Sequence, residues 1–362
     1  MGFISMMEFS YTLNNIFEIL KKNGLNARLR SEHKADWNVV WQRLPMQPTS
    51  ISESMIDYQH AYLRSTGSSV LDLSMVIFND GKPCAIWPLT LSLSVDKEVQ
   101  LSSIGEDIKC PYFIFNLSLN TQKKIIRHAV DSLEYLRGFL GKSDLRIEEN
   151  SSLNYNNLSL SEWHQQWMMR GGEPKIRHEL YVDLTLSIED IYSNMRKSYR
   201  SLIQQGSKLW EVTCIDHENL TPALWNEFRE LHLKAAGKVT RSEETWHLQY
   251  LMILQNEGFL LTLRTIDGSS TLIGGAFFQN TKDEGYYAVA AYDRNLFDKP
   301  IGHVLQMRAI QLMKDKNIKW YRIGERMFPS DIPKPSDKQI SISNFKQGFA
   351  THLIPKFSLM CN

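Results

Sequence analysis

The sequence predicts an α/β (α+β) protein built from two tandem domains, each a mixed, mostly antiparallel sheet flanked by helices. Its 362 residues are enough for two domains of ordinary size. One order of elements, namely strand, hairpin, strand, strand, helix and strand, occurs in both halves of the chain. An Asp-Gly turn marks the hairpin each time, at residues 80–81 and 267–268. This repeat indicates duplication of one domain.

In the first half, three strands are predicted around the hairpin, at residues 71–79, 83–93 and 98–104. A helix follows at residues 121–141, because Thr121 can cap it, an apolar stripe runs along it and Gly141 can end it. Residues 144–149 predict a fourth strand. A further helix is expected at residues 50–65, ahead of the whole set.

The second half repeats this order, with strands predicted at residues 259–266, 272–279, 285–292 and 318–324. A helix at residues 302–316 separates the last two strands, and helices at residues 221–236 and 242–255 precede the set. Two glycines and a proline interrupt the periodicity within residues 170–177. The two domains are therefore expected at residues 1–172 and 173–362.

The net charge is too small to attract a polyanionic partner by long-range electrostatics. Lys+Arg 41 against Asp+Glu 40 leave a formal charge of +1, so we expect no DNA binding and only a local site for any polyanion. The four cysteines are far apart and form neither a zinc motif nor a disulfide framework. Neither a secretory signal nor a run long enough to span a membrane is found, and we expect a soluble, cytoplasmic protein.

Several common catalytic motifs are missing from the sequence. There is no Gly-x-Ser-x-Gly elbow, no His-Glu-x-x-His pair and no phosphate-binding loop with its lysine. The ten histidines are scattered along the chain. We therefore expect neither a metal site nor nucleotide hydrolysis, and chemistry without a covalent nucleophile remains.

A candidate anion site precedes the helix at residues 302–316. Lys299, Pro300 and Gly302 lie there, and the free N–H groups of a helix start favour a negative group such as a pyrophosphate. Lys299 would lie beside that group. The alternative is that Pro300 and Gly302 only turn the chain into the helix.

The strand at residues 285–292 ends on candidate acid and base groups. Tyr287 and Tyr292 lie within it, and Asp293, which follows, can accept a proton or orient an amine. Strict alternation along the strand places Tyr287 and Tyr292 on opposite faces of the sheet. The alternative for Asp293 is that it caps the next loop.

Two other groups of charges are candidates for substrate binding. A basic face with an aromatic residue suits a phosphate-rich partner such as tRNA or a nucleotide-linked sugar, although a solvated helix face is the alternative. This face consists of Arg196, Lys197, Arg200 and Lys208 around Tyr199. Arg322 and Glu325 lie at the end of the last strand, where an Arg–Glu ion pair is the alternative to substrate binding.

One lysine near the end of the chain stands between two aromatic residues. If Phe345 and Phe349 pack against the domain, Lys346 is held near apolar surface while its ammonium group seeks an anion or a carbonyl oxygen. A lysine that only extends from the edge of the domain into solvent is the alternative. We expect Lys346 and Asp293 to face one cavity.

Three stretches resemble FemAB-like proteins and the related acetyltransferase-like family of the GNAT superfamily. These are residues 179–212, residues 285–324, which contain "GYYAVAAYDRN" and "PIGHVLQMRAIQLMKDKNIKWYRIG", and residues 342–349, "ISNFKQGF". Most of residues 178–352 are covered, whereas the first half is similar only in its order of elements. The resemblance implies two fused GNAT-like domains and acyl or aminoacyl transfer to an amine. In the first domain the stretch at the donor-loop position lacks the glycines of that loop, and Glu106 or Asp107 would repel a pyrophosphate, so this domain is expected to be degenerate and to shape the acceptor pocket or to be structural.

The same resemblance implies roles for individual residues. It places Lys346 at the acyl-transfer site, where the matching lysine helps to hold the carbonyl or phosphate group. It assigns the donor pyrophosphate to a loop that corresponds here to residues 299–304, with Lys299, Gly302 and His303, and it places a basic residue equivalent to Arg200 near the substrate. Lys299 replaces the usual Gln or Arg of that loop and Val304 replaces its last small residue.

The predicted function is N-acyl transfer to an amine of an amino sugar or a cell-envelope precursor. The donor is acyl-CoA, such as acetyl-CoA, or an aminoacyl-tRNA, and no metal is expected. One alternative is tRNA-dependent aminoacyl transfer to a peptidoglycan precursor. Another is a noncatalytic protein that binds a sugar or a partner through its aromatic residues. A role in polysaccharide biosynthesis would fit the amino-sugar acceptor.

Overall fold

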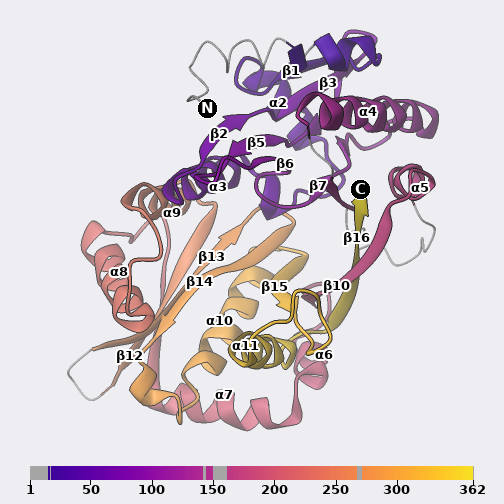
Figure 1. Ribbon diagram of the computed structural model, residues 1–362. Coiled ribbons are helices and arrows are strands. Elements are labelled where there is room, and N and C mark those ends of the chain that lie inside the picture. The colour runs from indigo at the N-terminus through magenta and orange to yellow at the C-terminus, as the bar shows by residue number, and fades with distance from the viewer. Residues whose placement is uncertain (1–14, 17, 142–143, 150–160, 267–270, 362) are drawn as a thin grey trace. The chain divides into compact units, whose positions relative to one another are not determined.

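The computed structural model describes residues 15–16, 18–141, 144–149, 161–266 and 271–361 (Figure 1). The chain divides into two compact units. The N-terminal unit consists of Met1–Pro45, Thr66–Ile176 and Lys356–Asn362, and the C-terminal unit of Met46–Ser65 and Arg177–Pro355. Each unit is therefore assembled from segments that are far apart in the sequence. The chain enters the C-terminal unit first at Met46 and again at Arg177. The predicted boundary between residues 172 and 173 stays a prediction.

The C-terminal unit is built on one mixed sheet with the strand order β11-β12-β13-β14-β15-β10-β16. Its strands are β10 (Glu173–Asp183), β11 (Trp210–Ile215), β12 (Gly258–Thr265), β13 (Leu272–Asn280), β14 (Glu284–Tyr292), β15 (Trp320–Arg326) and β16 (His352–Cys361). The β11-β12, β12-β13, β13-β14 and β10-β15 pairs are antiparallel, and β14 and β15 are parallel. The predicted turn at residues 267–268 lies outside the described residues.

Helices cover both faces of this sheet (Figure 1). One face packs on α3 (Glu53–Ser65), α8 (Pro222–Ala236) and α9 (Glu243–Leu254). The other packs on α6 (Ile188–Asn194), α7 (Lys197–Leu209) and α10 (Ile301–Asp315). The alternation of buried side chains along the strands explains this, since Phe259, Leu261 and Leu263 face α10 while Leu260 faces α8.

A buried polar network holds the segment 46–65 in the C-terminal unit. The carboxylate of Glu284 accepts hydrogen bonds from the backbone N–H and the hydroxyl of Thr49, at 2.7 and 2.6 Å. Asp283 accepts from the backbone N–H of Gln47 at 3.0 Å. Buried carboxylates satisfied in this way hold their partners firmly. The sequence pattern did not indicate that this predicted helix belongs to the later unit.

The N-terminal unit carries shorter strands than the sequence predicts. They are β1 (Ala27–Leu29), β2 (Ser69–Asp72), β3 (Met75–Asn79), β4 (Lys82–Trp87), β5 (Thr90–Leu93), β6 (Val99–Ser102), β7 (Ile108–Lys109), β8 (Tyr112–Phe113) and β9 (Leu145–Glu148). They form the sheets β1-β3-β4-β8 and β2-β5-β6, while β9 pairs with β7 and with the last residues of β16. Pro88 separates β4 from β5, because proline cannot donate to a ladder.

Local signals in this unit otherwise act as expected. Asp80 and Gly81 both have positive φ, 49° and 74°, as the hairpin turn between β3 and β4 requires. The long helix is α4 (Leu119–Phe139), and its cap is Ser118 instead of Thr121, since the Ser118 hydroxyl accepts from the Thr121 N–H. The remaining helices of the unit are α2 (Lys34–Gln42) and α5 (Glu162–Met169).

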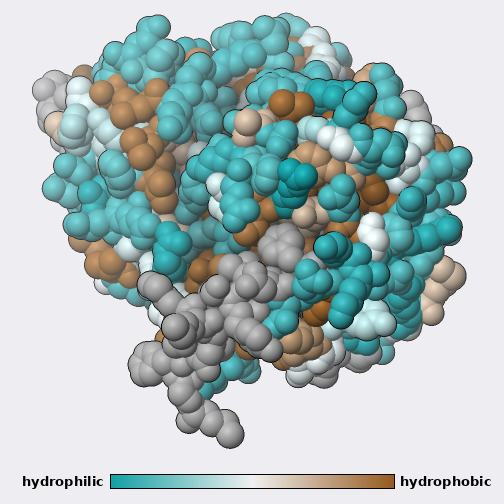
Figure 2. Space-filling model, turned by 90° about the horizontal axis from the view of Figure 1, so that it is seen from above, coloured by the Kyte–Doolittle hydropathy of each residue, from teal (hydrophilic) through white to brown (hydrophobic). Residues whose placement is uncertain are grey.

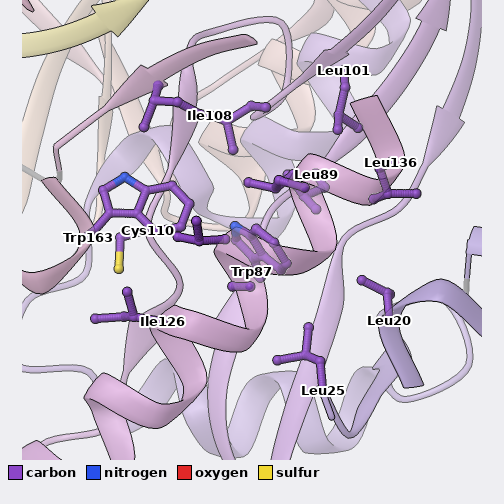
Figure 3. Packing of buried hydrophobic residues seen from close by; sticks show 14 of the residues in the cluster. Leu20, Leu25, Trp87, Leu89, Leu101, Ile108, Cys110, Ile126, Leu136 and Trp163 are labelled. Atoms are coloured by element: carbon purple, nitrogen blue, oxygen red, sulfur yellow. The ribbon is translucent and has the colours of Figure 1, made fainter. Parts of the chain in front are cut away.

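The core of the N-terminal unit is apolar and contains several tryptophans (Figure 3). Trp87 and Trp163 pack edge to face with ring centroids 6.4 Å apart, and Trp163 packs in the same way on Trp167 at 5.8 Å. The Trp87 indole donates to the Lys109 carbonyl at 2.8 Å. All three tryptophans are fully buried, so this Trp-rich cluster orders the domain around α4 and α5.

The predicted fold class is confirmed, since each unit combines mostly antiparallel strands with helices that flank them. The face in Figure 2 is mainly hydrophilic, with apolar side chains in separate patches. Among the described helices, none has the length and apolar character needed to cross a bilayer. The described residues hold no cluster of His, Cys, Asp and Glu fit for a metal ion.

Candidate functional site

Two parallel strands separate at the centre of the C-terminal sheet. β14 and β15 are paired only from Glu284 opposite Trp320 to Tyr286 opposite Arg322. Both strands continue beyond that point, to Tyr292 and Arg326. Their backbones therefore diverge beyond this point, and strands that separate in this way can receive an extended group by backbone hydrogen bonds. We call this place the strand opening, bounded by Tyr287 on β14 and Ile323–Gly324 on β15.

A β-bulge lies beside the strand opening. Phe277 and Phe278 on β13 pair with Val289 and Tyr287, so Ala288 is an extra residue on β14. The bulge breaks the strict alternation that the sequence predicted. Tyr287 and Tyr292 consequently lie on the same face, and their hydroxyl groups are hydrogen-bonded at 3.2 Å. Placing them on opposite faces was wrong.

Lys346 projects into the strand opening. Its Nζ lies 5.4 Å from the centroid of the Tyr287 ring, and a Cβ atom added to Gly324 would be 2.8 Å from Nζ. Gly324 has φ of +128°, a backbone conformation that side chains disfavour. The side chain of Lys346 thus occupies space that only a glycine on β15 leaves open.

The surroundings of Lys346 favour its neutral form. Burial lowers its pKa from the ordinary 10.5 to about 8, and the Arg322 guanidinium acts in the same direction. Glu179 and Glu325 oppose that shift. An amine with this pKa exists in both protonation states near neutral pH, and can donate a hydrogen bond to a developing oxyanion.

Helix α11 (Asp337–Gln347) carries Lys346 in its last turn, and α7 holds that turn in place. The Tyr199 hydroxyl donates to the Phe345 carbonyl at 3.1 Å, and Arg196 donates to the carbonyl and side chain of Asn344 at 3.0 and 3.1 Å. Phe349 is fully buried against Tyr199, with ring centroids 4.8 Å apart. The predicted packing of Phe345 and Phe349 around the lysine is confirmed.

Arg322 lies beside the strand opening in a buried ionic network. Its guanidinium is 3.3 Å from Glu179 and 3.8 Å from Glu284, and it covers the Tyr286 ring at 4.1 Å. It also donates to the Thr49 hydroxyl at 3.3 Å. Although burial opposes it, the two carboxylates hold the pKa of Arg322 well above its ordinary value. Its ion-pair partners are Glu179 on β10 and Glu284 on β14, and its role in substrate binding stays a prediction.

Glu325 lies opposite Glu179 on the neighbouring strand β10. Residues directly opposite in an antiparallel pair have their side chains on one face, so two carboxylates lie close together near Lys346. Both act on the lysine by charge. The structure therefore brings together Lys346, Tyr287, Arg322 and Glu325 of the predicted site residues, and adds Glu179.

The start of α10 lacks a side-chain cap. Pro300 is its N-cap residue and makes no side-chain cap hydrogen bond, and the Ile301 N–H donates to the Lys299 carbonyl at 2.9 Å. An uncapped helix start is a place where an anion can bind. Lys299 is exposed and 3.2 Å from Asp298. Gly302 packs on Phe345, because an added Cβ would be 3.0 Å from that ring. The pyrophosphate-binding role of this loop stays a prediction.

His303, in the first turn of α10, is enclosed by aromatic rings. It packs edge to face on Tyr199 at 4.5 Å and on Phe345 at 5.1 Å. Burial, with a smaller effect of Arg196, lowers its pKa to about 4, so the ring is neutral at pH 7. Its Nδ1 atom is buried without a hydrogen-bond partner among the described residues.

Asp293 and Arg200 have local partners. Asp293 accepts a hydrogen bond from the Asn295 N–H at 3.0 Å, the loop cap that the sequence offered as its alternative role, and it lies 3.9 Å from Lys234. The expectation that Lys346 and Asp293 face one cavity stays a prediction. Arg200 is exposed and donates to the Tyr192 carbonyl at 3.0 Å.

Sequence reasoning missed Gly324 and Glu179 as parts of this site, and it assigned Tyr199 to the basic face without its contact to the Lys346 turn. A glycine at the end of a predicted strand, in "YRIGER", was a signal for close approach of another group. Glu179, in the otherwise apolar run "ELYV", was a signal for a buried charge with a partner. The hydrogen bond from the Tyr199 hydroxyl to the Phe345 carbonyl has no local sequence pattern that would predict it, because the two residues are distant in the sequence.

No model of a known protein family and no curated protein sequence matches this chain. Its fold is similar to solved structures. The crystal structure of FemX superposes with a TM-score of 0.60 over 91% of this chain and 96% of FemX, at 11% identity. The C-terminal DUF2156 domain of a putative lysylphosphatidylglycerol synthetase from Agrobacterium fabrum has a TM-score of 0.52 over 91% of each chain, also at 11% identity. The predicted resemblance to FemAB-like proteins is therefore confirmed for the fold alone.

Proposed function

We propose that this protein is an acyltransferase that moves an acyl or aminoacyl group to an amine at the strand opening. The single observation that carries the proposal is the position of Lys346, whose Nζ lies between Tyr287 of β14 and Gly324 of β15. An ammonium group at that place can stabilise negative charge on a carbonyl oxygen. The names of the similar structures, FemX and a putative lysylphosphatidylglycerol synthetase, are consistent with aminoacyl chemistry.

The proposed reaction is direct transfer. The neutral amine of the acceptor attacks the carbonyl carbon of a thioester or ester, a C–N bond forms, and the carbonyl oxygen becomes an oxyanion that Lys346 stabilises. The C–S or C–O bond then breaks, a proton passes to the leaving thiolate or alkoxide, and the proton that the amine loses restores the group that donated it. This route needs no covalent enzyme intermediate, which agrees with the missing nucleophile motifs.

The leaving group needs a proton, and the tyrosine pair can supply it. Burial raises the pKa of both Tyr287 and Tyr292, so both phenols are protonated at neutral pH. Their hydroxyl groups are linked at 3.2 Å, and a proton that leaves one can be replaced from the other. We assign Tyr287 as the proton donor because Lys346 lies against its ring.

We propose the start of α10 as the binding place of the donor. Its N-cap residue supplies no side-chain cap, and Lys299 lies beside it at the surface, in an exposed ion pair with Asp298. A donor phosphate there would leave its acyl chain free to run along the edge of β14, towards the bulge at Ala288. Acyl-CoA, including acetyl-CoA, suits this geometry.

A charged tRNA is the second candidate donor, and one observation favours it. The basic residues on and before α7 are all exposed, and α7 contacts the helix turn that carries Lys346. They are Arg196, Lys197, Arg200 and Lys208. This candidate predicts salt-sensitive tRNA binding that the double change Arg196→Ala and Arg200→Ala weakens. The acceptor would then be a peptidoglycan precursor.

The test is donor turnover by the purified full chain. Acetyl-CoA, longer acyl-CoAs and charged tRNAs are offered with nucleotide-linked amino sugars and other cell-envelope amines, and products are followed by mass spectrometry. We expect transfer from one donor class in the wild type and none with Lys346→Ala. Lys338→Ala, which changes an exposed lysine of the same helix, is the matched control. Binding of a sugar without turnover by any donor would favour the noncatalytic alternative.

A further inference from the structure

A cavity of about 580 Å³ lies between α8 and α9, built from residues that the proposed transfer site does not use. It is lined by the last turns of α8, the connecting segment 238–242 and the first turns of α9. Its volume falls within the roughly 300–1000 Å³ that small-molecule sites occupy. All of its lining residues belong to the C-terminal unit.

Trp246 lines this cavity, and two arginines of the lining contact its ring. The guanidinium carbons of Arg229 and Arg241 lie 5.9 and 5.7 Å from the centroid of its indole, and His232 packs edge to face on it at 5.1 Å. Because Trp246 is only 6% exposed, the arginines are fixed above a rigid apolar base. Their charged groups are thereby presented to the cavity.

Arg241 carries a charge that its own partners do not neutralise. Its Nε donates to the Tyr58 hydroxyl at 3.2 Å, and its Nη1 donates to Nε2 of His232 at 3.1 Å. Burial and the charge of Arg241 lower the pKa of His232 to about 4, so this imidazole is neutral and accepts the hydrogen bond. Both partners of Arg241 are therefore uncharged.

The other charges around the cavity also leave room for an anion. Lys238 is exposed at the rim. The ion pair of Arg229 with Glu243 is loose, since the atoms are 3.9 Å apart and the Glu243 side chain is 96% exposed. Glu230 is the remaining carboxylate of the lining. The lining thus carries three cationic and two anionic side chains. The excess positive charge favours an anionic ligand.

We propose that this cavity is a second binding site, which takes a small organic phosphate. The phosphate group would bind Arg241 and Lys238, because a guanidinium fork and an ammonium together match phosphate oxygens. The organic part would lie on Leu233 and Val239, which are 47% and 78% exposed at the rim. A free phosphate ion is too small to fill the cavity, so we assign the site to a phosphate ester.

The test is isothermal titration of the full chain with glucose 6-phosphate and with AMP, at physiological salt. Glucose and adenosine are the matched uncharged probes. We expect saturable binding of one phosphate ester per chain, no binding of its uncharged counterpart, and about tenfold weaker binding with Arg241→Gln, because a charged hydrogen-bond partner is lost. Lys238→Gln, an exposed change that leaves the fold intact, should weaken it about threefold.

Two control variants make the result specific. Arg308→Gln, an exposed arginine on α10, and Lys346→Met, at the transfer site, should both bind as the wild type does. Absence of saturable binding for both esters would overturn the proposal. Binding that both Arg241→Gln and Lys238→Gln leave unchanged, or that Lys346→Met abolishes, would overturn it as well, since the ligand would then bind elsewhere.

Discussion

The Nζ atom of Lys346 lies where a side chain on Gly324 would be, 2.8 Å from the position of its absent Cβ. The two residues come from different elements, the last turn of α11 and the strand β15. β15 has already separated from β14 at this point. The lysine can thus reach the strand opening because Gly324 has no side chain to occupy that space.

Gly324→Ala should remove activity and lower stability. The added methyl group collides with Nζ, and alanine at φ of +128° is strained, by about 1–3 kcal/mol in the free energy of unfolding. Urea unfolding and the transfer assay measure the two effects. The control is Gly138→Ala in helix α4, where an added Cβ would have nothing within 4 Å, and the free energy of unfolding should rise by about 0.5–1 kcal/mol. A fully active Gly324→Ala variant would contradict the close contact.

Lys346→Met should stabilise the protein at pH 7. The folded-state pKa of about 8 lies below the ordinary 10.5, so the folded chain pays for a buried charge below pH 8. The unfolded state binds more protons between these values, and wild-type stability therefore rises from pH 8 to 10.5. We expect Lys346→Met to be about 1–3 kcal/mol more stable at pH 7, with a smaller difference at pH 10.

Urea unfolding at pH 7 and pH 10 checks this expectation, with Lys338→Met on the exposed side of α11 as the control. The control should change stability by less than about 0.5 kcal/mol at both values. A loss of stability in Lys346→Met at pH 7 would show that burial of the charged lysine does not destabilise the folded state.

Arg322→Met should destabilise the C-terminal unit strongly. The change leaves Glu179 and Glu284 buried without their cation, which costs about 3–5 kcal/mol. Thermal and urea unfolding measure the loss. Arg308→Met, on the exposed side of α10, is the matched control and should be nearly neutral. If Arg322→Met leaves the free energy of unfolding unchanged, the arginine does not stabilise the fold and acts only in substrate binding.

Tyr199→Phe should reduce turnover more than stability. The change removes the hydroxyl that donates to the Phe345 carbonyl at 3.1 Å, next to Lys346. Unfolding free energy should fall by about 0.5–1.5 kcal/mol, whereas a less firmly held lysine should lower kcat several-fold with KM little changed. Tyr135→Phe, which changes an exposed tyrosine of α4, is the control. Unchanged kcat would remove Tyr199 from the positioning of Lys346.

The sequence predicted most elements because their signals are local. The hairpin at Asp80 and Gly81, the apolar stripe of α4 and the helices α8 and α9 each depend on residues close together in the chain. The bulge at Ala288 carries no such signal, since it depends on how β13 and β14 pair. For the same reason alternation assigned Tyr287 and Tyr292 to different faces.

The site could be predicted only in part. Lys346 was found from its place between Phe345 and Phe349, a local pattern. Its neighbours Gly324 and Tyr199 reach it through tertiary contacts between distant segments. The attachment of Thr49 to Glu284 was likewise outside the reach of periodicity, because a helix pattern does not tell which unit receives the helix.

The central claim is that Lys346 stabilises the transition state of acyl transfer. The most direct measurement is kcat for transfer from the active donor, compared between the wild type, Lys346→Met and the exposed control Lys338→Met. We predict a loss of about 100-fold or more in Lys346→Met, with its folded state intact and the control unchanged. A Lys346→Met variant that transfers the acyl group at the wild-type rate would contradict the account.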